Sequence, residues 1–202
     1  ERLRLDASEA SDEVLIEGFV AVEQARLAPS PVSLTYFEVG TLAALWTIAR
    51  RQPELAVLEV GLGGRLDAVN VVDPDVAVVT TVAQDHAAFL GNDIAIIGRE
   101  KAGIMRTGRP AVLGSASLPA SVHDTAARLG AQVHCLAREF TQSADASGWC
   151  WQGHDTQGQG LTLTALPDPG LPLDNAASAL QALALQVPRQ APPLRSGQPY
   201  FG

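Results

Sequence analysis

The sequence predicts an α/β protein built on a doubly wound, mostly parallel sheet. Short apolar, β-branched runs bounded by turn residues are typical of strands that are covered on both faces. Stretches with helical periodicity alternate with these runs, which indicates right-handed βαβ crossovers. One run ends on a carboxylate and passes into a glycine-rich loop, the position where open α/β sheets place their chemistry. The predicted strands are residues 55–60, 76–82, 110–113 and 132–136.

Local signals predict where the helices begin. Ser11 precedes two acidic residues and an amphipathic stretch that ends before Pro29, so it predicts a first helix. The spacing of Thr35 and Glu38 is that of a capping box and predicts a second helix, which continues to Arg51. Two further helices are expected over residues 94–105 and 121–129.

The pattern changes after residue 140. Apolar residues alternate around turn residues at 149–151 and 161–163, which predicts a hairpin that extends the edge of the domain. Asp174 or Asn175 is expected to cap a last helix that continues to residue 184. Residues 188–202 contain four prolines and predict a linker, so the predicted domain covers residues 1–187.

Composition narrows the range of functions. The 202 residues are 47% hydrophobic, which is enough for a core, and no apolar run approaches the roughly 20 residues that span a bilayer. We therefore expect a cytoplasmic protein without a membrane partner. The net charge of −8 and the scattered basic residues disfavour binding to nucleic acid, and we expect a monomer.

Three segments carry a resemblance to a known family. They are Leu-Glu-Val-Gly-Leu-Gly-Gly-Arg-Leu-Asp at 58–67, Gln-Asp-His at 84–86 and Gly-Arg-Glu-Lys-Ala-Gly-Ile at 98–104. In this order they resemble the central ATPase domain of the folylpolyglutamate synthase/dihydrofolate synthase family, within the Mur ligase superfamily. The resemblance extends from residue 1 to about residue 175. It implies a domain like the P-loop NTPases with a small β extension.

The sequence departs from this family in one respect that concerns ATP. No Gly-x-x-x-x-Gly-Lys-Ser/Thr loop occurs in the 202 residues, although the family depends on one. The resemblance implies that the first strand with this loop and a second domain lie outside the sequence. We therefore expect the chain by itself to be inactive. An alternative from another class is a non-catalytic remnant that retains pterin binding, and a cell-wall Mur ligase relative is a further alternative.

The resemblance implies ATP-dependent addition of L-glutamate to dihydropteroate or folylpolyglutamate through an acyl phosphate, with Mg²⁺ as the metal. Glu59 and His86 would be metal ligands, and Lys101 would be carbamylated to form an anionic group at the metal and phosphate site. The residues alone leave other interpretations open. Glu59 could form an ion pair with an arginine, His86 could cap its loop, and Lys101 could lie on a solvated helix face.

The resemblance also implies a pterin-binding site. Asp67 with its neighbours Leu66 and Ala68 matches one part of it, and the segment Thr35, Tyr36, Phe37 and Glu38 matches another. A carboxylate suits the ring N–H and amino donors of a pterin, and an aromatic ring can stack on it. The alternative roles are structural: an Asx-turn at Asp67, which asparagine would also form, and the capping box at Thr35 and Glu38.

One residue is a candidate contact for the adenine of ATP. Asn175, followed by two alanines, resembles the adenine-contacting Asn-Ala-Ala of the family. The His-Gln that the family has shortly before it is replaced by Pro172 and Leu173. The resemblance thus implies that Asn175 contacts ATP, although the His-Gln that precedes this asparagine in the family is absent.

Overall fold

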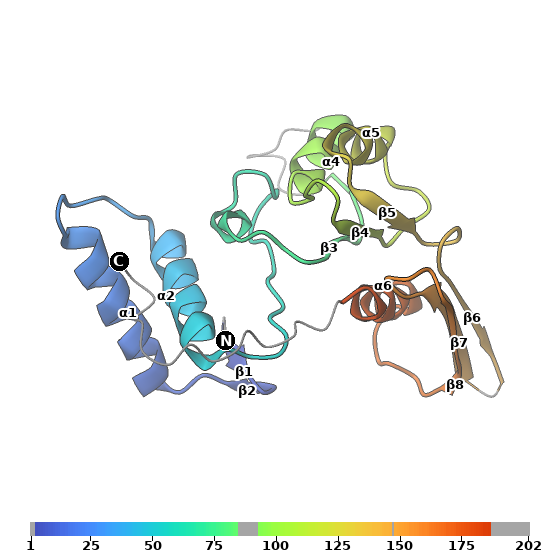
Figure 1. The fold of residues 1–202 in the computed structure, drawn as a ribbon, viewed down its shortest axis with the longest axis horizontal. Helices are drawn as coiled ribbons and strands as arrows, with labels where there is room; N and C mark the ends of the chain where they lie inside the picture. The colour runs from blue at the N-terminus through green and yellow to red at the C-terminus, as the bar shows by residue number, and fades with distance from the viewer. Residues whose placement is uncertain (1–2, 85–92, 147, 187–202) are drawn as a thin grey trace. The chain divides into compact units, whose positions relative to one another are not determined.

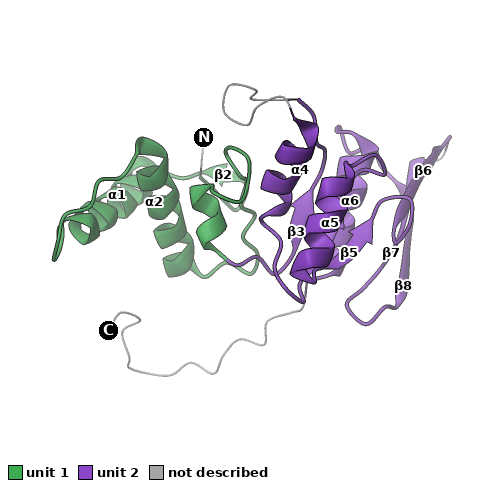
Figure 2. Cartoon of the chain, turned by 90° about the horizontal axis from the view of Figure 1, so that it is seen from above, with its two compact units in different colours: residues 1–72 green, residues 73–202 purple. Residues whose placement is uncertain are grey.

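The computed structural model describes residues 3–84, 93–146 and 148–186. It divides into two compact units, residues 1–72 (unit 1) and residues 73–202 (unit 2), which Figure 2 distinguishes by colour. The sequence-based prediction of one domain over residues 1–187 followed by a linker stays a prediction, and the linker lies outside the described residues. No helix of the described part of the chain has the length and apolar character that crossing a membrane requires.

Unit 1 is built around two packed helices. The strands β1 (Arg4–Leu5) and β2 (Ser8–Glu9) form a short antiparallel pair before α1 (Asp12–Leu27) and α2 (Tyr36–Arg51). The helices contact each other at Gly18, where an added Cβ would lie 2.9 Å from the carbonyl oxygen of Ala43. This approach requires a residue without a side chain. A 3₁₀ helix, η1 (Ala68–Val71), follows the glycine-rich loop and contacts α2.

Unit 2 contains the predicted parallel sheet, which Figure 1 shows with its helices. Three parallel strands lie in the order β3 (Ala77–Val79), β4 (Pro110–Leu113) and β5 (Gln132–Cys135). The connections between them include α4 (Ile94–Ala102) and α5 (Ala120–Leu129). These elements confirm the prediction of an α/β fold with a parallel sheet and crossover helices.

The central strand of this sheet is buried on both faces. Ala111 and Leu113 belong to a core cluster that includes Val122 and Ala126 of α5. Val112 between them belongs to a second cluster, which includes Ala177 of α6 (Leu173–Ala184) and both tryptophans of the antiparallel sheet. Because successive side chains of a strand point to opposite faces, two layers cover the sheet.

The extension after residue 140 has three strands. β6 (Thr141–Asp145), β7 (Gly148–His154) and β8 (Gly160–Leu166) form an antiparallel sheet. The predicted hairpin corresponds to β7 and β8, and β6 was missed because its residues, Thr-Gln-Ser-Ala-Asp, are polar and largely exposed. The fully buried Gln181 of α6 joins the helix to this sheet, since its side-chain amide bonds both backbone groups of His154.

The predicted strand over residues 55–60 is wrong. These residues have no regular secondary structure and form no backbone hydrogen bond with another described residue. Leu55 is 46% exposed and Val57 is 85% exposed. A strand requires a hydrogen-bonded neighbour, and an apolar run shows only that a segment is suited to pairing.

Other predicted bounds needed smaller corrections. β3 covers only part of the predicted strand 76–82, and α4 ends at Ala102 rather than at residue 105. The last helix begins at Leu173 with Pro172 at its N-cap, so Asp174 and Asn175 lie in its first turn and do not cap it. Proline is favourable at a helix start because the first backbone N–H groups have no partner within the helix.

Candidate functional site

The glycine-rich loop of unit 1 is closed by the side chain of Asp67. Its Oδ1 accepts a hydrogen bond from the backbone N–H of Val69 at 2.9 Å, and its Oδ2 accepts one from Leu62 at 2.9 Å. The first bond makes Asp67 the N-cap of η1, and the second draws the start of the loop toward its end. The side-chain amide of Asn70 donates to the carbonyl of Arg65 at 3.0 Å. The structural interpretation of Asp67 is thus confirmed.

The ring of Phe37 lies against this loop. An added Cβ on Gly61 would lie 2.6 Å from Cζ and 2.8 Å from Cε2 of Phe37, and 3.4 Å from Oδ2 of Asp67. The aromatic ring from the start of α2 and the carboxylate of the loop therefore meet at Gly61. The structure brings together two of the residues that the resemblance assigned to pterin binding, although they are thirty positions apart in the sequence.

Thr35 and Glu38 form the predicted capping box at the start of α2. The backbone N–H of Glu38 donates to Oγ1 of Thr35 at 3.2 Å, and the backbone N–H of Thr35 donates to Oε2 of Glu38 at 2.7 Å. The hydroxyl of Thr35 also donates to this oxygen at 2.8 Å. The backbone N–H of Thr35, followed by its hydroxyl, lowers the pKa of Glu38 below its usual value. Their structural role is confirmed, and their role toward a substrate stays a prediction.

The remaining predicted pterin residues flank the same loop and helix start. Tyr36 is 79% exposed and Leu66 is 78% exposed, so both present apolar surface that a ligand could cover. Ala68 is the first residue of η1 and is partly buried. All of the predicted pterin residues therefore belong to unit 1.

The predicted metal and phosphate residues belong to different units of the chain. Glu59 is exposed in unit 1, just before the glycine-rich loop, whereas Lys101 is partly buried in the last turn of α4 in unit 2. His86 lies outside the described residues. Oxygen donors from Glu59 and a carbamylated Lys101 would suit Mg²⁺ chemically. Among the described residues, however, no group of three histidine, cysteine or acidic side chains is arranged to hold a metal.

Asn175 lies exposed in the first turn of α6. Its backbone N–H donates to the carbonyl of Pro172 at 2.9 Å, as expected where a helix begins. The neighbouring Asp174 accepts a hydrogen bond from the side chain of Gln142 at 3.0 Å. The side chain of Asn175 is accessible to a ligand, and its assignment to ATP stays a prediction.

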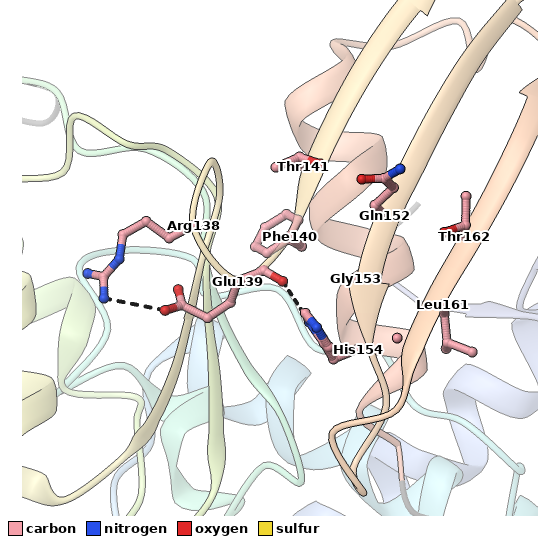
Figure 3. A pocket seen from close by; sticks show the side chains of 10 residues that line it. Arg138, Glu139, Phe140, Thr141, Gln152, Gly153, His154, Leu161 and Thr162 are labelled. Atoms are coloured by element: carbon pink, nitrogen blue, oxygen red, sulfur yellow. Dashed lines mark hydrogen bonds and ion pairs between the residues drawn. The ribbon is translucent and has the colours of Figure 1, made fainter.

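A cavity of about 300 Å³ lies in unit 2, and its lining includes none of the predicted site residues. Figure 3 shows that it is bordered by the turn before β6 and by the faces of β7 and β8. Its charged groups stabilise the turn itself. Glu139 accepts the backbone N–H of Cys135 at 2.8 Å and pairs with Arg138 at 3.3 Å, while Nδ1 of His154 donates to the carbonyl of Glu139 at 2.9 Å. The arrangement explains the turn and indicates no ligand.

Gly61 is the residue of the candidate site that the sequence did not identify. Its run of neighbouring glycines was visible, but the contact with Phe37 depends on the fold and has no local signature. Gly63 differs, because its positive φ of 69° is a conformation that favours glycine.

Comparison with known proteins gives the family. The model of the Mur ligase middle domain matches residues 9–126. The dihydrofolate synthase/folylpolyglutamate synthase of Escherichia coli is 45% identical over 183 residues, which are 91% of this chain and 42% of that protein. The corresponding protein of Haemophilus influenzae is 37% identical over 91% of this chain and 40% of its own length. The chain thus spans about two fifths of the relatives that it matches.

Solved structures agree with this result. FolC of Escherichia coli in complex with DHPP and ADP matches with a TM-score of 0.81 and 44% identity, covering 91% of this chain and 43% of that one. A bifunctional folylpolyglutamate synthase/dihydrofolate synthase of Yersinia pestis complexed with AMPPNP and Mn matches with a TM-score of 0.79 and 43% identity, covering 91% and 44%. The chain therefore belongs to the Mur ligase family through its middle domain, and the relatives described above, to which it is similar, are dihydrofolate synthases/folylpolyglutamate synthases.

Proposed function

We propose that this chain provides the pterin-binding part and metal ligands of an ATP-dependent ligase that adds L-glutamate to dihydropteroate or folylpolyglutamate. The observation that carries the proposal is the meeting of the Phe37 ring and the Asp67 carboxylate at Gly61. An aromatic face beside a carboxylate is complementary to a flat heterocycle with N–H donors. The match to a FolC structure that contains DHPP supports the same assignment.

In the proposed site, Asp67 accepts the ring N–H and amino donors of the pterin while Phe37 contacts its face. A carboxylate has about four lone-pair positions, and two of those on Asp67 are used by Leu62 and Val69. Capacity for two more donors therefore remains. Tyr36 and Leu66 are exposed beside the helix start and the loop, where they would cover the apolar surface of the substrate.

The proposed reaction has two steps. The substrate carboxylate attacks the γ-phosphorus of ATP, which releases ADP and leaves an acyl phosphate. The amino group of glutamate then attacks the acyl carbon, phosphate leaves, and the new amide loses a proton. Mg²⁺, held by Glu59, His86 and a carbamylated Lys101, would neutralise phosphate charge, and Asn175 would contact ATP.

A chimera tests the proposal as a whole. The segment of the Escherichia coli relative that aligns with this chain would be replaced by the chain, and glutamate incorporation into dihydropteroate would be measured with ATP. We expect ligation that is lost in Glu59→Ala and Lys101→Ala and retained in Arg128→Ala, a change of an exposed residue of α5. A folded chimera without activity would contradict the proposal.

The 202-residue polypeptide gives a second test by itself. We expect calorimetry to show binding of dihydropteroate, and the ligation assay to show no product because the sequence has no phosphate loop. Gel filtration tests the expectation of a monomer, and the cytoplasmic location stays a prediction. Measured turnover by this polypeptide would overturn the expectation of inactivity and leave the proposed substrate in place.

The carbamate on Lys101 has its own test. Lys101 is the only lysine in this sequence, so within this chain a side-chain lysine carbamate formed from CO₂ can arise at one place, and comparison with Lys101→Ala separates it from lysines of the Escherichia coli part of the chimera. In the active chimera with ¹³C-bicarbonate, we expect a ¹³C carbamate resonance whose intensity falls when Lys101 is replaced by alanine. Acetate should partly restore ligation to this variant by occupying the vacated anionic position. An unchanged spectrum would remove the carbamate from the proposal.

A further inference from the structure

Residue 61 is a glycine because a side chain would collide with its neighbours there, and not because of its backbone conformation. It is not among the glycines with a left-handed φ, so alanine could adopt the same backbone. The Cβ of an alanine would nevertheless lie 2.6 Å from Cζ of Phe37. Carbon atoms in contact are about 3.5–4.0 Å apart, so the ring or the loop would have to move by roughly 1 Å.

Both partners of this contact are held in place. Phe37 lies in the first turn of α2, directly inside the capping box of Thr35 and Glu38. On the other side, the N–H of Leu62, the residue after Gly61, is bonded to Asp67. Moving the loop would stretch this bond, and moving the helix start would break the cap. A methyl group at residue 61 would therefore displace the Phe37 ring by rotating its side chain.

We infer that Gly61 is a positioning residue for the pterin pocket: its missing side chain lets the Phe37 ring lie beside the Asp67 carboxylate. The inference rests on the proposed function and adds a determinant of substrate selection. A ring held at this distance from a carboxylate matches a flat heterocycle whose donors lie at its edge. Gly61 acts through Phe37 and Asp67 and needs no contact with the substrate.

A double-mutant cycle in the full 202-residue chain tests the inference. Dissociation constants for dihydropteroate would be measured for the wild type, Gly61→Ala, Phe37→Leu and the double variant. We expect each single variant to weaken binding by about tenfold, the size of one aromatic contact. Adding Gly61→Ala to Phe37→Leu should weaken it no further, because the ring that the methyl displaces is already gone.

Two controls separate positioning from general damage. Gly40 lies in α2 with no atom within 4 Å of an added Cβ, so Gly40→Ala should leave the affinity unchanged. Binding of p-aminobenzoate, which lacks the pterin ring, should be the same in Gly61→Ala and in the wild type. An equal loss of affinity for dihydropteroate and p-aminobenzoate in Gly61→Ala would indicate a general structural effect and overturn the inference.

The remaining outcomes are also decisive. If the wild type does not bind dihydropteroate, the proposed function and the inference both fail. If the wild type binds and Gly61→Ala binds equally well, only the inference fails. If Gly61→Ala does not fold, the double variant with Phe37→Leu tests the inference instead. There the added methyl should be tolerated, and a double variant that fails to fold would show that something other than the ring opposes it.

Discussion

Asp67 combines a structural role with the proposed role in binding. Each of its carboxylate oxygens accepts one backbone N–H of the loop, from Val69 and from Leu62. The sequence suggested that asparagine could replace it in the turn, since asparagine also forms Asx-turns. The structure corrects this expectation. Asparagine has one oxygen and one amino group, so it can accept only one of the two bonds and turns a donor toward the other N–H.

We therefore predict that Asp67→Asn lowers both stability and affinity for dihydropteroate. Loss of one partly buried hydrogen bond should reduce the free energy of unfolding by about 1–3 kcal/mol. Asp155→Asn is the matched control, because a single oxygen of Asp155 accepts both of its bonds, from Gln157 and Gln159. Denaturant unfolding of both variants checks the prediction, and an unchanged midpoint for Asp67→Asn would contradict it.

The capping box of α2 should make unit 1 sensitive to acid. The pKa of Glu38 is lowered because the ionised carboxylate accepts bonds from Thr35, first from its backbone N–H and then from its hydroxyl. A lowered folded pKa means that the stabilisation is complete above the ordinary glutamate pKa of about 4.3 and is lost as the pH falls through the folded value. The protection factors of the α2 amides, which correct for the pH dependence of intrinsic exchange, should therefore fall on acidification.

The variant Glu38→Gln isolates this contribution. Glutamine can still accept the bond from the Thr35 N–H but has no titrating charge, so the acid-dependent part of the α2 protection should shrink. The comparison is made below the ordinary glutamate pKa of about 4.3, because the pKa of the native Glu38 carboxylate is lowered. An identical pH profile in the wild type and in Glu38→Gln would refute the contribution of Glu38.

At the scale of the element, local signals predicted helices better than strands. α2 was predicted well because its capping box lies within four consecutive residues and is formed in the structure. β4 was predicted because its apolar run is buried within its own unit. The equally apolar residues 55–60 form no strand, and the polar β6 forms one by pairing with β7. Pairing depends on distant residues, which a local pattern does not contain.

The connection between α6 and the antiparallel sheet depends on one polar side chain. The amide nitrogen of Gln181 donates to the carbonyl of His154 at 2.8 Å, and its oxygen accepts the N–H of His154 at 3.3 Å. Gln181→Leu would leave both backbone groups without this partner. We predict a loss of about 2–4 kcal/mol in the unfolding of unit 2.

The exposed Gln157 provides the control for this prediction. It lies in the turn between β7 and β8, so Gln157→Leu should change stability by less than about 0.5 kcal/mol. Chemical denaturation followed by tryptophan fluorescence is suitable, because Trp149 and Trp151 are buried in the same sheet. Equal unfolding midpoints for Gln181→Leu and the wild type would show that the buried amide contributes nothing.

At the scale of the whole molecule, the predicted site is divided between two units. The resemblance assigned Phe37 and Asp67 to one pterin site, and the structure places both beside Gly61 within unit 1; their role toward a pterin stays a prediction. It could not predict the contact with Gly61 or the use of both Asp67 oxygens by the loop, because these depend on atomic packing. Glu59 and Lys101 belong to separate units, so the sequence remains the basis of their proposed shared role.

The division into two units predicts which amides a bound substrate should protect from hydrogen exchange. All of the residues proposed for the pterin belong to unit 1, so dihydropteroate should slow hydrogen exchange at residues 35–38 and 62–70 in the full chain. Exchange at β4 and β5 of unit 2 should change little, because a ligand stabilises the part that it binds. Phe37→Leu should reduce the protection of both unit 1 segments together, since they meet at Gly61. Protection confined to unit 2 would place the substrate elsewhere and exclude the proposed pocket.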